Sequence, residues 1–514
     1  MRSKNAFRNL AVSLLYELFI LILGLIVPRY IIVSYGDSVN GLTQTINRLL
    51  MLVNMLQAGA IGASIYQMLA PVANNDYKTQ SEIMYSSKKF FDKMGAIYLL
   101  IVAVCSIFFG FHLQDENLNV LEIILSFMVL ALNGSLYFFF TARYDIVFSS
   151  YQKKYLLSIA SFIERITYYL LLFLVIFGKL YFIYMYVALL CGGLVRVIIN
   201  SIFYRKLVGK NLIKKPENKN YVIKDRSYLM LASIGDQTIE AAPTVIITTF
   251  VSLLASSVFS VYSMIYLSMK TLINSFHHAV SAIFGNLVAT SKDKKIASVF
   301  DSLLYVFTML GTFLASCCAF LFMAFIGLYS LEFEESASYF VPLLAGFIVA
   351  YVAVFSLKSV FIFVSNSYGL FKLTCKATLI CGIISIAVSI VLTILFGMPY
   401  VMVGVLLYHV STTCIYVFFF RKEVSWFRFS YKWIGRIFLL IALPSVSWFI
   451  YTLNLYPITG WLGWFISAII FAVIVLAILL IYTLIFERKA FFSLLEYIKS
   501  IFLSKKRKSV TEEQ

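Results

Sequence analysis

Charged residues are scarce in this chain of 514 residues. Only 13% of the residues are charged and 61% are hydrophobic, whereas roughly a quarter of the residues in a soluble domain are charged. The apolar residues also come in blocks of about 20, the length of α-helix that crosses a hydrocarbon core of ~30 Å. These proportions exclude a soluble multidomain protein and predict an all-α integral membrane protein.

The sequence also lacks the motifs of catalysis and of nucleotide binding. It contains no Walker loop, no dinucleotide-binding glycine fingerprint and no zinc motif, which excludes an ATP-driven pump with its own nucleotide-binding domain. The seven cysteines show neither zinc-ligand spacing nor a disulfide framework. The longest predicted external loop, of about 10 residues, is short for a membrane-embedded glycan polymerase. We therefore expect no enzyme, no metal site and no cofactor beyond a coupling H⁺ or Na⁺.

Positive charge is abundant, and its distribution predicts the topology. Of the 42 Lys and Arg residues, 35 lie in segments that are cytoplasmic if the N-terminus is inside, and one, Lys179, lies in an external connection. This asymmetry is typical of the positive-inside rule and argues against nucleic acid as a partner. We expect a multi-pass membrane protein with both termini in the cytoplasm. The fourteen predicted spans are 10–34, 42–69, 95–111, 121–142, 156–177, 180–202, 227–253, 257–285, 301–328, 339–364, 377–396, 400–420, 437–456 and 461–486.

A basic linker after the sixth span predicts two six-helix lobes. Pro28 and Pro243 each lie in an outward-going helix that is followed by a short external turn, and the segments 38–42 and 257–261 open the next helices. Such a repeat would be parallel, as in the two halves of some transporters. The predicted organisation is an N-terminal lobe at 1–205, a linker at 206–226, a C-terminal lobe at 227–425, two additional helices at 426–486 and a basic tail at 487–514.

Ionisable residues inside the spans are the candidate functional residues. Each costs ~2.5–3.5 kcal/mol at mid-bilayer on insertion scales, so it normally faces a cavity or a partner. At 1.5 Å per residue, four of them lie ~13–20 Å deep: Arg165, Asp236, Glu240 and Lys270. Glu17 lies in the inner third of the first span, and Arg29 and Arg48 lie on either side of the first external turn. Arg196 and Lys358 lie near the inner ends of their spans, where long side chains reach the headgroups.

The signs of these charges bear on the substrate. Asp236 and Glu240 are four residues apart and share one helix face, so they form a candidate proton or sodium coupling site together with Glu17. Alternatively, each acid neutralises a base such as Arg165 or Lys270. Four bases favour a phosphate-bearing cargo, because guanidinium binds phosphate through paired hydrogen bonds. An acidic cavity would instead suit a cationic drug.

The N-terminal 95 residues resemble bacterial polysaccharide flippases of the Wzx type. These belong to the superfamily of multidrug, oligosaccharidyl-lipid and polysaccharide exporters (MOP). The resemblance is carried by VPRYII at 27–32, YGDSVNGL at 35–42, QAGAIGASIY at 57–66, and Pro71. Beyond about residue 100 it is one of helix number and spacing.

The resemblance implies a cavity between two six-helix lobes and a cargo of undecaprenyl-pyrophosphate-linked oligosaccharide. Arg29 and Arg48 match positions where such proteins carry cavity bases, and Arg165 and Lys270 join them by depth. The lipid tail would follow a groove involving spans 13 and 14. Expected partners are membrane lipids, a polysaccharide polymerase and glycosyltransferases. The alternatives are an ion-coupled exporter of cationic drugs, similar to the MATE transporters, and a membrane scaffold for glycan assembly.

Overall fold

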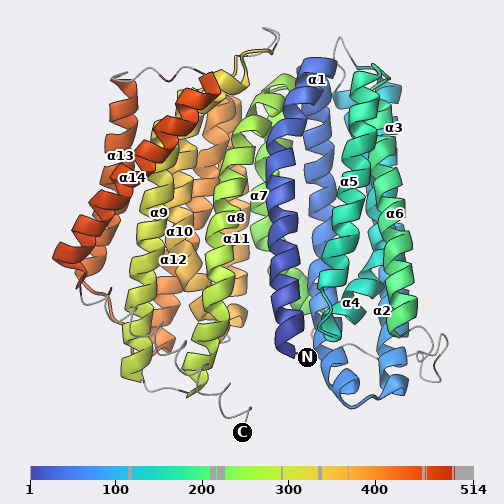
Figure 1. The fold of residues 1–514 in the computed structure, drawn as a ribbon, viewed down its shortest axis with the longest axis horizontal. Helices are drawn as coiled ribbons and strands as arrows, with labels where there is room; N and C mark the ends of the chain where they lie inside the picture. Colours follow the sequence, from blue (N-terminus) through green and yellow to red (C-terminus); the bar gives the residue numbers. More distant parts are fainter. Residues whose placement is uncertain are drawn as a thin grey trace. The chain divides into compact units, whose positions relative to one another are not determined.

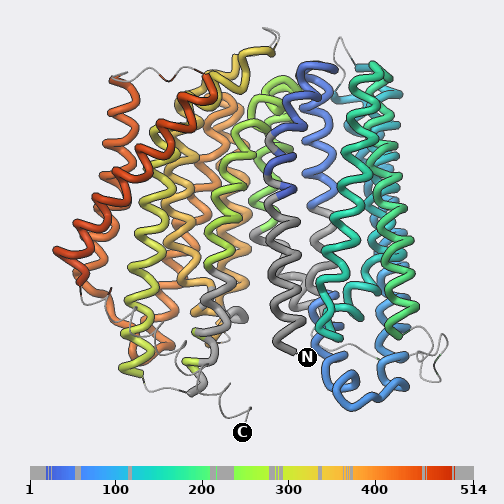
Figure 2. Tube along the Cα trace, in the orientation of Figure 1, coloured from blue at the N-terminus to red at the C-terminus, as the bar shows by residue number. Residues whose placement is uncertain are grey.

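The structure is a computed structural model in which most of the chain can be followed (Figure 2). It describes residues 2–113, 118–208, 226–290, 293–333, 338–368, 370–453 and 460–488, together with positions 216, 221, 458 and 491. Most of the predicted basic tail at 487–514 and most of the linker at 206–226 lie outside the described residues.

Helices account for every predicted span, which confirms the all-α membrane fold (Figure 1). Among the described residues, 12 helices are long and apolar enough to cross a membrane. The first two spans are two helices, together labelled α1, that meet at the non-helical backbone of Gly36, where φ is 86°. Only glycine adopts such a φ without steric cost. The helices are α1 (Arg2–Ala73), α2 (Tyr77–His112), α3 (Val120–Leu136), α4 (Ala142–Ser150), α5 (Tyr155–Phe177), α6 (Ile183–Leu207), α7 (Arg226–Phe250), α8 (Leu253–Thr290), α9 (Asp293–Tyr329), α10 (Pro342–Ser367), α11 (Phe371–Phe396), α12 (Val401–Glu423), α13 (Lys432–Thr452) and α14 (Gly460–Phe486).

The fourth span contains a widened turn. Residues Tyr137–Thr141 form one turn of π-helix that joins α3 to α4. Single π-turns of this kind displace the helix register and are frequent at functional sites.

The chain divides into two compact units. Unit 1 comprises Met1–Val261, Glu332–Ala337 and Thr393–Met398, and unit 2 comprises Tyr262–Leu331, Ser338–Leu392 and Pro399–Gln514. This division follows residue packing and falls inside α8, whereas the predicted lobes at 1–205 and 227–425 follow the polar linker. One division describes the packing of residues and the other the position of the linker in the sequence, so the two lobes remain a prediction.

In unit 1, the two segments that we compared in the sequence, 38–42 and 257–261, lie against each other. The Asn40 amide donates hydrogen bonds to the hydroxyls of Ser257 (2.9 Å) and Ser260 (3.0 Å). Ser257 in turn donates to Asp37 at 3.2 Å. The close approach requires Gly41, because a Cβ at this position would overlap the carbonyl group of Leu253. The first turns of the second half of α1 and of α8 are thus joined by buried polar groups.

In unit 2, α9 is the central helix and packs against α10, α13 and α14. The described part of α14 buries one row of residues, spaced four apart, and leaves its other faces exposed. A row with this spacing runs obliquely along a helix, and Figure 1 shows α14 inclined to α9 accordingly. The row consists of Ser467, Phe471, Val475, Leu479 and Thr483.

Candidate translocation site

Three of the four predicted cargo-binding bases lie in unit 1. Arg29, on the first half of α1, makes an ion pair with Glu332 at 2.9 Å. Arg48, on the second half, is half-buried and contacts the sulfur of Met51 at 3.8 Å. Arg165 is half-buried on α5. The charge of Arg29 is therefore partly neutralised in this conformation, and the cargo-binding roles of all three remain predictions.

The fourth base, Lys270, lies in unit 2 beside a group of aromatic side chains. Its ammonium nitrogen is 5.8 Å from the centre of the Phe355 ring on α10. The imidazole of His409, on α12, meets Phe355 edge-on, with ring centres 5.6 Å apart. Aromatic faces attract cations electrostatically, so the Phe355 ring is a favourable contact for the ammonium group of Lys270.

Lys358 belongs to the same region, and our prediction that it reaches the headgroups is wrong. The residue is only 1% exposed, and its ammonium nitrogen lies 4.3 Å from the centre of the Tyr408 ring. A charge at such a position is held by the protein interior. Helix position alone could not reveal this, because burial depends on which neighbour faces the side chain.

Arg196 is held by an acid on the neighbouring helix. It donates a hydrogen bond to Glu164 at 3.1 Å, from α6 to α5, and its guanidinium lies 5.7 Å from the centre of the Tyr137 ring. Glu164 is buried, and a carboxylate inside a membrane span normally requires a partner. Arg196 is this partner, and the headgroup interpretation of Arg196 is replaced by an ion pair inside unit 1.

The predicted coupling acids are only partly visible. The side chains of Asp236 and Glu17 lie outside the described residues, although both positions belong to helices, α7 and α1. Glu240 is half-buried on α7. The coupling pair therefore remains a prediction. Within the described part of the chain, no group of three or more His, Cys, Asp or Glu could hold a metal ion.

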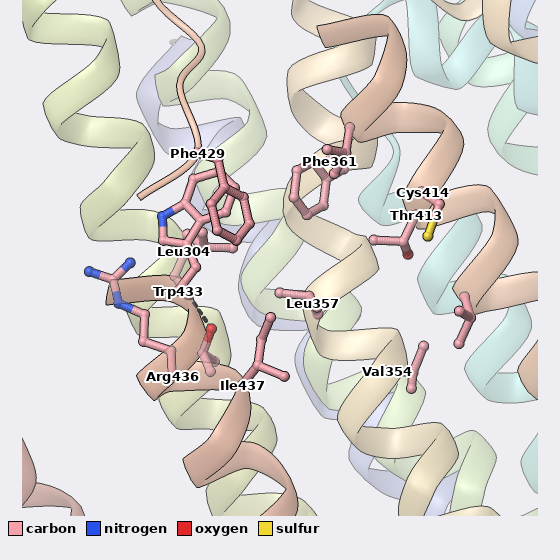
Figure 3. Close-up of a pocket in the computed structure, with 13 residues that line it drawn as sticks. Leu304, Val354, Leu357, Phe361, Thr413, Cys414, Phe429, Trp433, Arg436 and Ile437 are labelled. Carbon is pink, nitrogen blue, oxygen red and sulfur yellow. Dashed lines mark hydrogen bonds between the residues drawn. The ribbon is translucent and has the colours of Figure 1, made fainter. Parts of the chain in front are cut away.

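An apolar groove lies beside α13 in unit 2. It consists of two adjoining cavities of about 360 Å³ and about 480 Å³, which share Val354. The first is lined by side chains of α9, α10, α12 and α13, among them Leu304, Phe361 and Ile437 (Figure 3). The second continues between α10 and α13, past Leu440 to Trp448. We call these two cavities the α13 groove.

One cluster of charges was not predicted from the sequence. Arg436 on α13 and Glu487 after α14 are buried, and they form an ionic cluster with the partly exposed Asp301 on α9. Each of the three lies at the edge of a predicted span, on the side predicted to be cytoplasmic, and each therefore looked like a solvated flanking charge. The detectable signal was that three spans place opposite charges at the same membrane depth.

Comparisons with known proteins extend the fold to other chains. No protein-family model matches the sequence, and no curated protein matches it either. A structure of the lipid II flippase MurJ in an inward closed conformation is similar, with a TM-score of 0.69 at 16% identity over 93% of this chain and 99% of that chain. An inward-facing multidrug resistance MATE family transporter of the MOP superfamily has a TM-score of 0.61 at 13% identity, over 80% of this chain and 98% of its own.

An outward-facing structure of a MATE family transporter is also similar, with a TM-score of 0.53 at 13% identity over 82% of this chain and 94% of that chain. The chain thus has the fold of multi-pass transport proteins of the MOP superfamily. The structures it resembles are of transporters and of a flippase.

Proposed function

We propose that this chain is a flippase for undecaprenyl-pyrophosphate-linked oligosaccharide repeat units. It moves them from the inner to the outer leaflet of the bacterial plasma membrane for the synthesis of capsule, exopolysaccharide or O-antigen. The observation that carries the proposal is the similarity of fold to a lipid II flippase along 93% of the chain. The N-terminal resemblance to Wzx-type flippases supports it, because it narrows the cargo from lipid-linked glycans in general to polysaccharide repeat units.

The groove provides a second argument, from the chemistry of the cargo. A lipid-linked glycan has a long apolar tail and a pyrophosphate, so its carrier needs an apolar path beside a basic region. The α13 groove is lined almost wholly by apolar side chains, which suits an isoprenoid tail. Lys270 lies in the same unit. A cationic drug would not need so extended an apolar path.

Alternating access would carry the cargo across. Arg29, Arg48, Arg165 and Lys270 bind the pyrophosphate, with the guanidinium groups forming paired hydrogen bonds to its oxygens. Arg29 must release Glu332 to do so, because the 2.9 Å ion pair occupies it here. Asp236, Glu240 and Glu17 reset the protein by binding H⁺ or Na⁺. Both termini of the protein lie in the cytoplasm. A polymerase and glycosyltransferases act beside the protein.

The test is to replace two of the proposed cargo-binding bases. The R48A/R165A double variant removes two of the four proposed bases, so we expect the protein to fold while glycan translocation falls at least about tenfold, the equivalent of ~1.4 kcal/mol. Translocation would be measured with fluorescent lipid-linked glycan in proteoliposomes. The R48K/R165K variant is the matched control and should retain part of the activity. Full activity in R48A/R165A would refute the proposed pyrophosphate site.

An ion-coupled drug exporter is the second candidate. It is favoured by the fold similarity to MATE family transporters and by Glu240 on α7 beside the predicted partner Asp236. In this case D236N should abolish efflux of a cationic dye while surface glycan is unchanged. Loss of surface glycan without any change in dye efflux would favour the flippase.

A further inference from the structure

The Arg436 cluster joins three helices of unit 2 through one guanidinium group. Arg436 is 1% exposed and Glu487 2%. The guanidinium donates to both carboxylate oxygens of Glu487, at 2.7 and 3.0 Å. It also donates to both carboxylate oxygens of Asp301, at 2.8 and 3.0 Å, and to the Asp301 carbonyl at 3.1 Å. All five N–H donors of the arginine are therefore used, and none is left for a phosphate.

Neighbouring side chains complete the cluster. The Trp433 indole donates to Asp301 at 3.2 Å, and Lys432 approaches Glu487 at 4.0 Å. Tyr305 lies beneath the guanidinium, 5.8 Å away, and its hydroxyl hydrogen-bonds to Thr483 on α14 at 2.5 Å. The two bases and the two acids are balanced, so the cluster has no excess charge with which to recruit an ion.

The cluster lies where the buried row of α14 ends. The row runs from Ser467 to Thr483 in steps of four, and the next step is Glu487. Above it most described contacts of α14 are apolar, such as Phe471 stacked on Phe320 of α9 with ring centres 4.1 Å apart, and one is a hydrogen bond from the Trp464 indole to the Leu321 carbonyl at 3.2 Å. Dispersion between apolar side chains is not directional, so the apolar contacts select the register of α14 on α9 less sharply than polar contacts do. The ionic contacts select it sharply, because a slide of one turn, ~5.4 Å, separates Glu487 from Arg436.

The same arginine is also part of the groove wall. Its neighbours Trp433 and Ile437 line the α13 groove, together with the stem of Arg436. Figure 3 shows the guanidinium of Arg436 pointing away from Phe361 and Thr413, which lie across the groove. The charged head thus faces α9 and α14, and the helix that carries it forms one side of the groove.

From these contacts we infer that Arg436 is a positioning residue that fixes the register of α13 and α14 on α9 and thereby sets the width of the α13 groove. Buried ion pairs are weak sources of stability but serve well as devices that select one register. The role of Arg436 in fixing register follows from these contacts alone. An isoprenoid tail as the occupant of the α13 groove rests on the proposed function.

The test measures register rather than stability. Spin labels on K295C of α9 and I485C of α14, in a background without the seven native cysteines, report the distance between the two helices by pulsed electron spin resonance. The D301N/R436M/E487Q triple variant removes all three charges at similar side-chain size. We expect it to fold, with a melting temperature within about 4 °C of the parent, but with a distance distribution that broadens or shifts by ~5 Å.

Two further variants make the result specific. R436K keeps the charge but has only three donors, so it cannot hold both carboxylates bidentately, and its distances should lie between those of the parent and the triple variant. The E164Q/R196M variant neutralises a different ion pair, between α5 and α6, and should leave the distance unchanged. An unchanged, narrow distance in the triple variant would overturn the inference, and so would its failure to fold.

A transport assay separates this inference from the proposed function. Suppose that the distance between α9 and α14 changes in the triple variant, and that this variant translocates long-chain polyprenyl-pyrophosphate glycan more slowly than a short-chain analogue. This result supports both the role of Arg436 and the proposed flippase function. If register is lost but the parent protein moves no lipid-linked glycan at all, the proposed function fails and the role of Arg436 stands.

Discussion

At the scale of single residues, membrane depth predicts which charges need partners but not which partner each finds. Glu164 adjoins Arg165 in the sequence, yet it pairs with Arg196, 32 positions away, because residues next to each other on a helix point ~100° apart. Lys358 looked like a flanking residue and is buried on Tyr408. Partner choice is decided by helix packing, which no local pattern contains.

The Glu164–Arg196 pair leads to a stability prediction. R196M should destabilise the protein by about 2–3 kcal/mol, since it leaves a 7% exposed carboxylate without its partner; the loss is smaller than for a fully buried pair because Arg196 is 24% exposed. E164Q/R196M should lie within about 1 kcal/mol of the parent. Thermal unfolding in detergent measures both, and equal destabilisation of the single and double variants would contradict the prediction.

At the scale of elements, two kinds of local rule operate. Span positions follow from apolar runs of membrane length, and all fourteen predicted spans fall on helices. By contrast, helix ends and close approaches depend on individual residues. The bend at Gly36, the cap at Asp76 and the contact at Gly41 each require a particular residue type.

Gly41 gives a packing prediction with a matched control. A methyl group at Gly41 would overlap the Leu253 carbonyl, which is backbone and cannot turn aside. G41A should therefore cost about 2–3 kcal/mol, as overpacking usually does. At Gly62 no atom lies within 4 Å of the added Cβ, so G62A should be neutral or slightly stabilising. Thermal unfolding of the two variants should differ clearly, and equal melting temperatures would contradict the prediction.

Asp76 gives a pH prediction. Its carboxylate accepts a hydrogen bond from the backbone N–H of Thr79 at 3.1 Å, and bonds to the Thr79 side chain and backbone lower the pKa of Asp76 below its usual value. A lowered folded-state pKa adds stability above the ordinary pKa of aspartate, and this stability is lost as pH falls through the lowered value. D76N keeps the cap but loses the charge. The stability difference between D76N and the parent should therefore be present at pH 7 and vanish in acid.

At the scale of the whole molecule, the predicted topology has a direct test. Lys179, between α5 and α6, is predicted to be external, and Lys153, between α4 and α5, cytoplasmic. In a cysteine-free background, K179C should react with an impermeant maleimide in intact cells, and K153C should react only after permeabilisation. The reverse pattern would contradict the predicted orientation.

The sequence by itself determined that this protein is a bundle of membrane helices, because the hydrocarbon core demands apolar runs of one length. It also predicts which charges lie deep in the membrane. Only the tertiary structure decided that the helical segments 38–42 and 257–261 meet, that an apolar groove follows α13, and that Arg436 joins α9, α13 and α14. These features depend on which faces of separate helices pack together. The sequence does not reveal those faces, because a helix face that contacts lipid and one that contacts protein are both apolar.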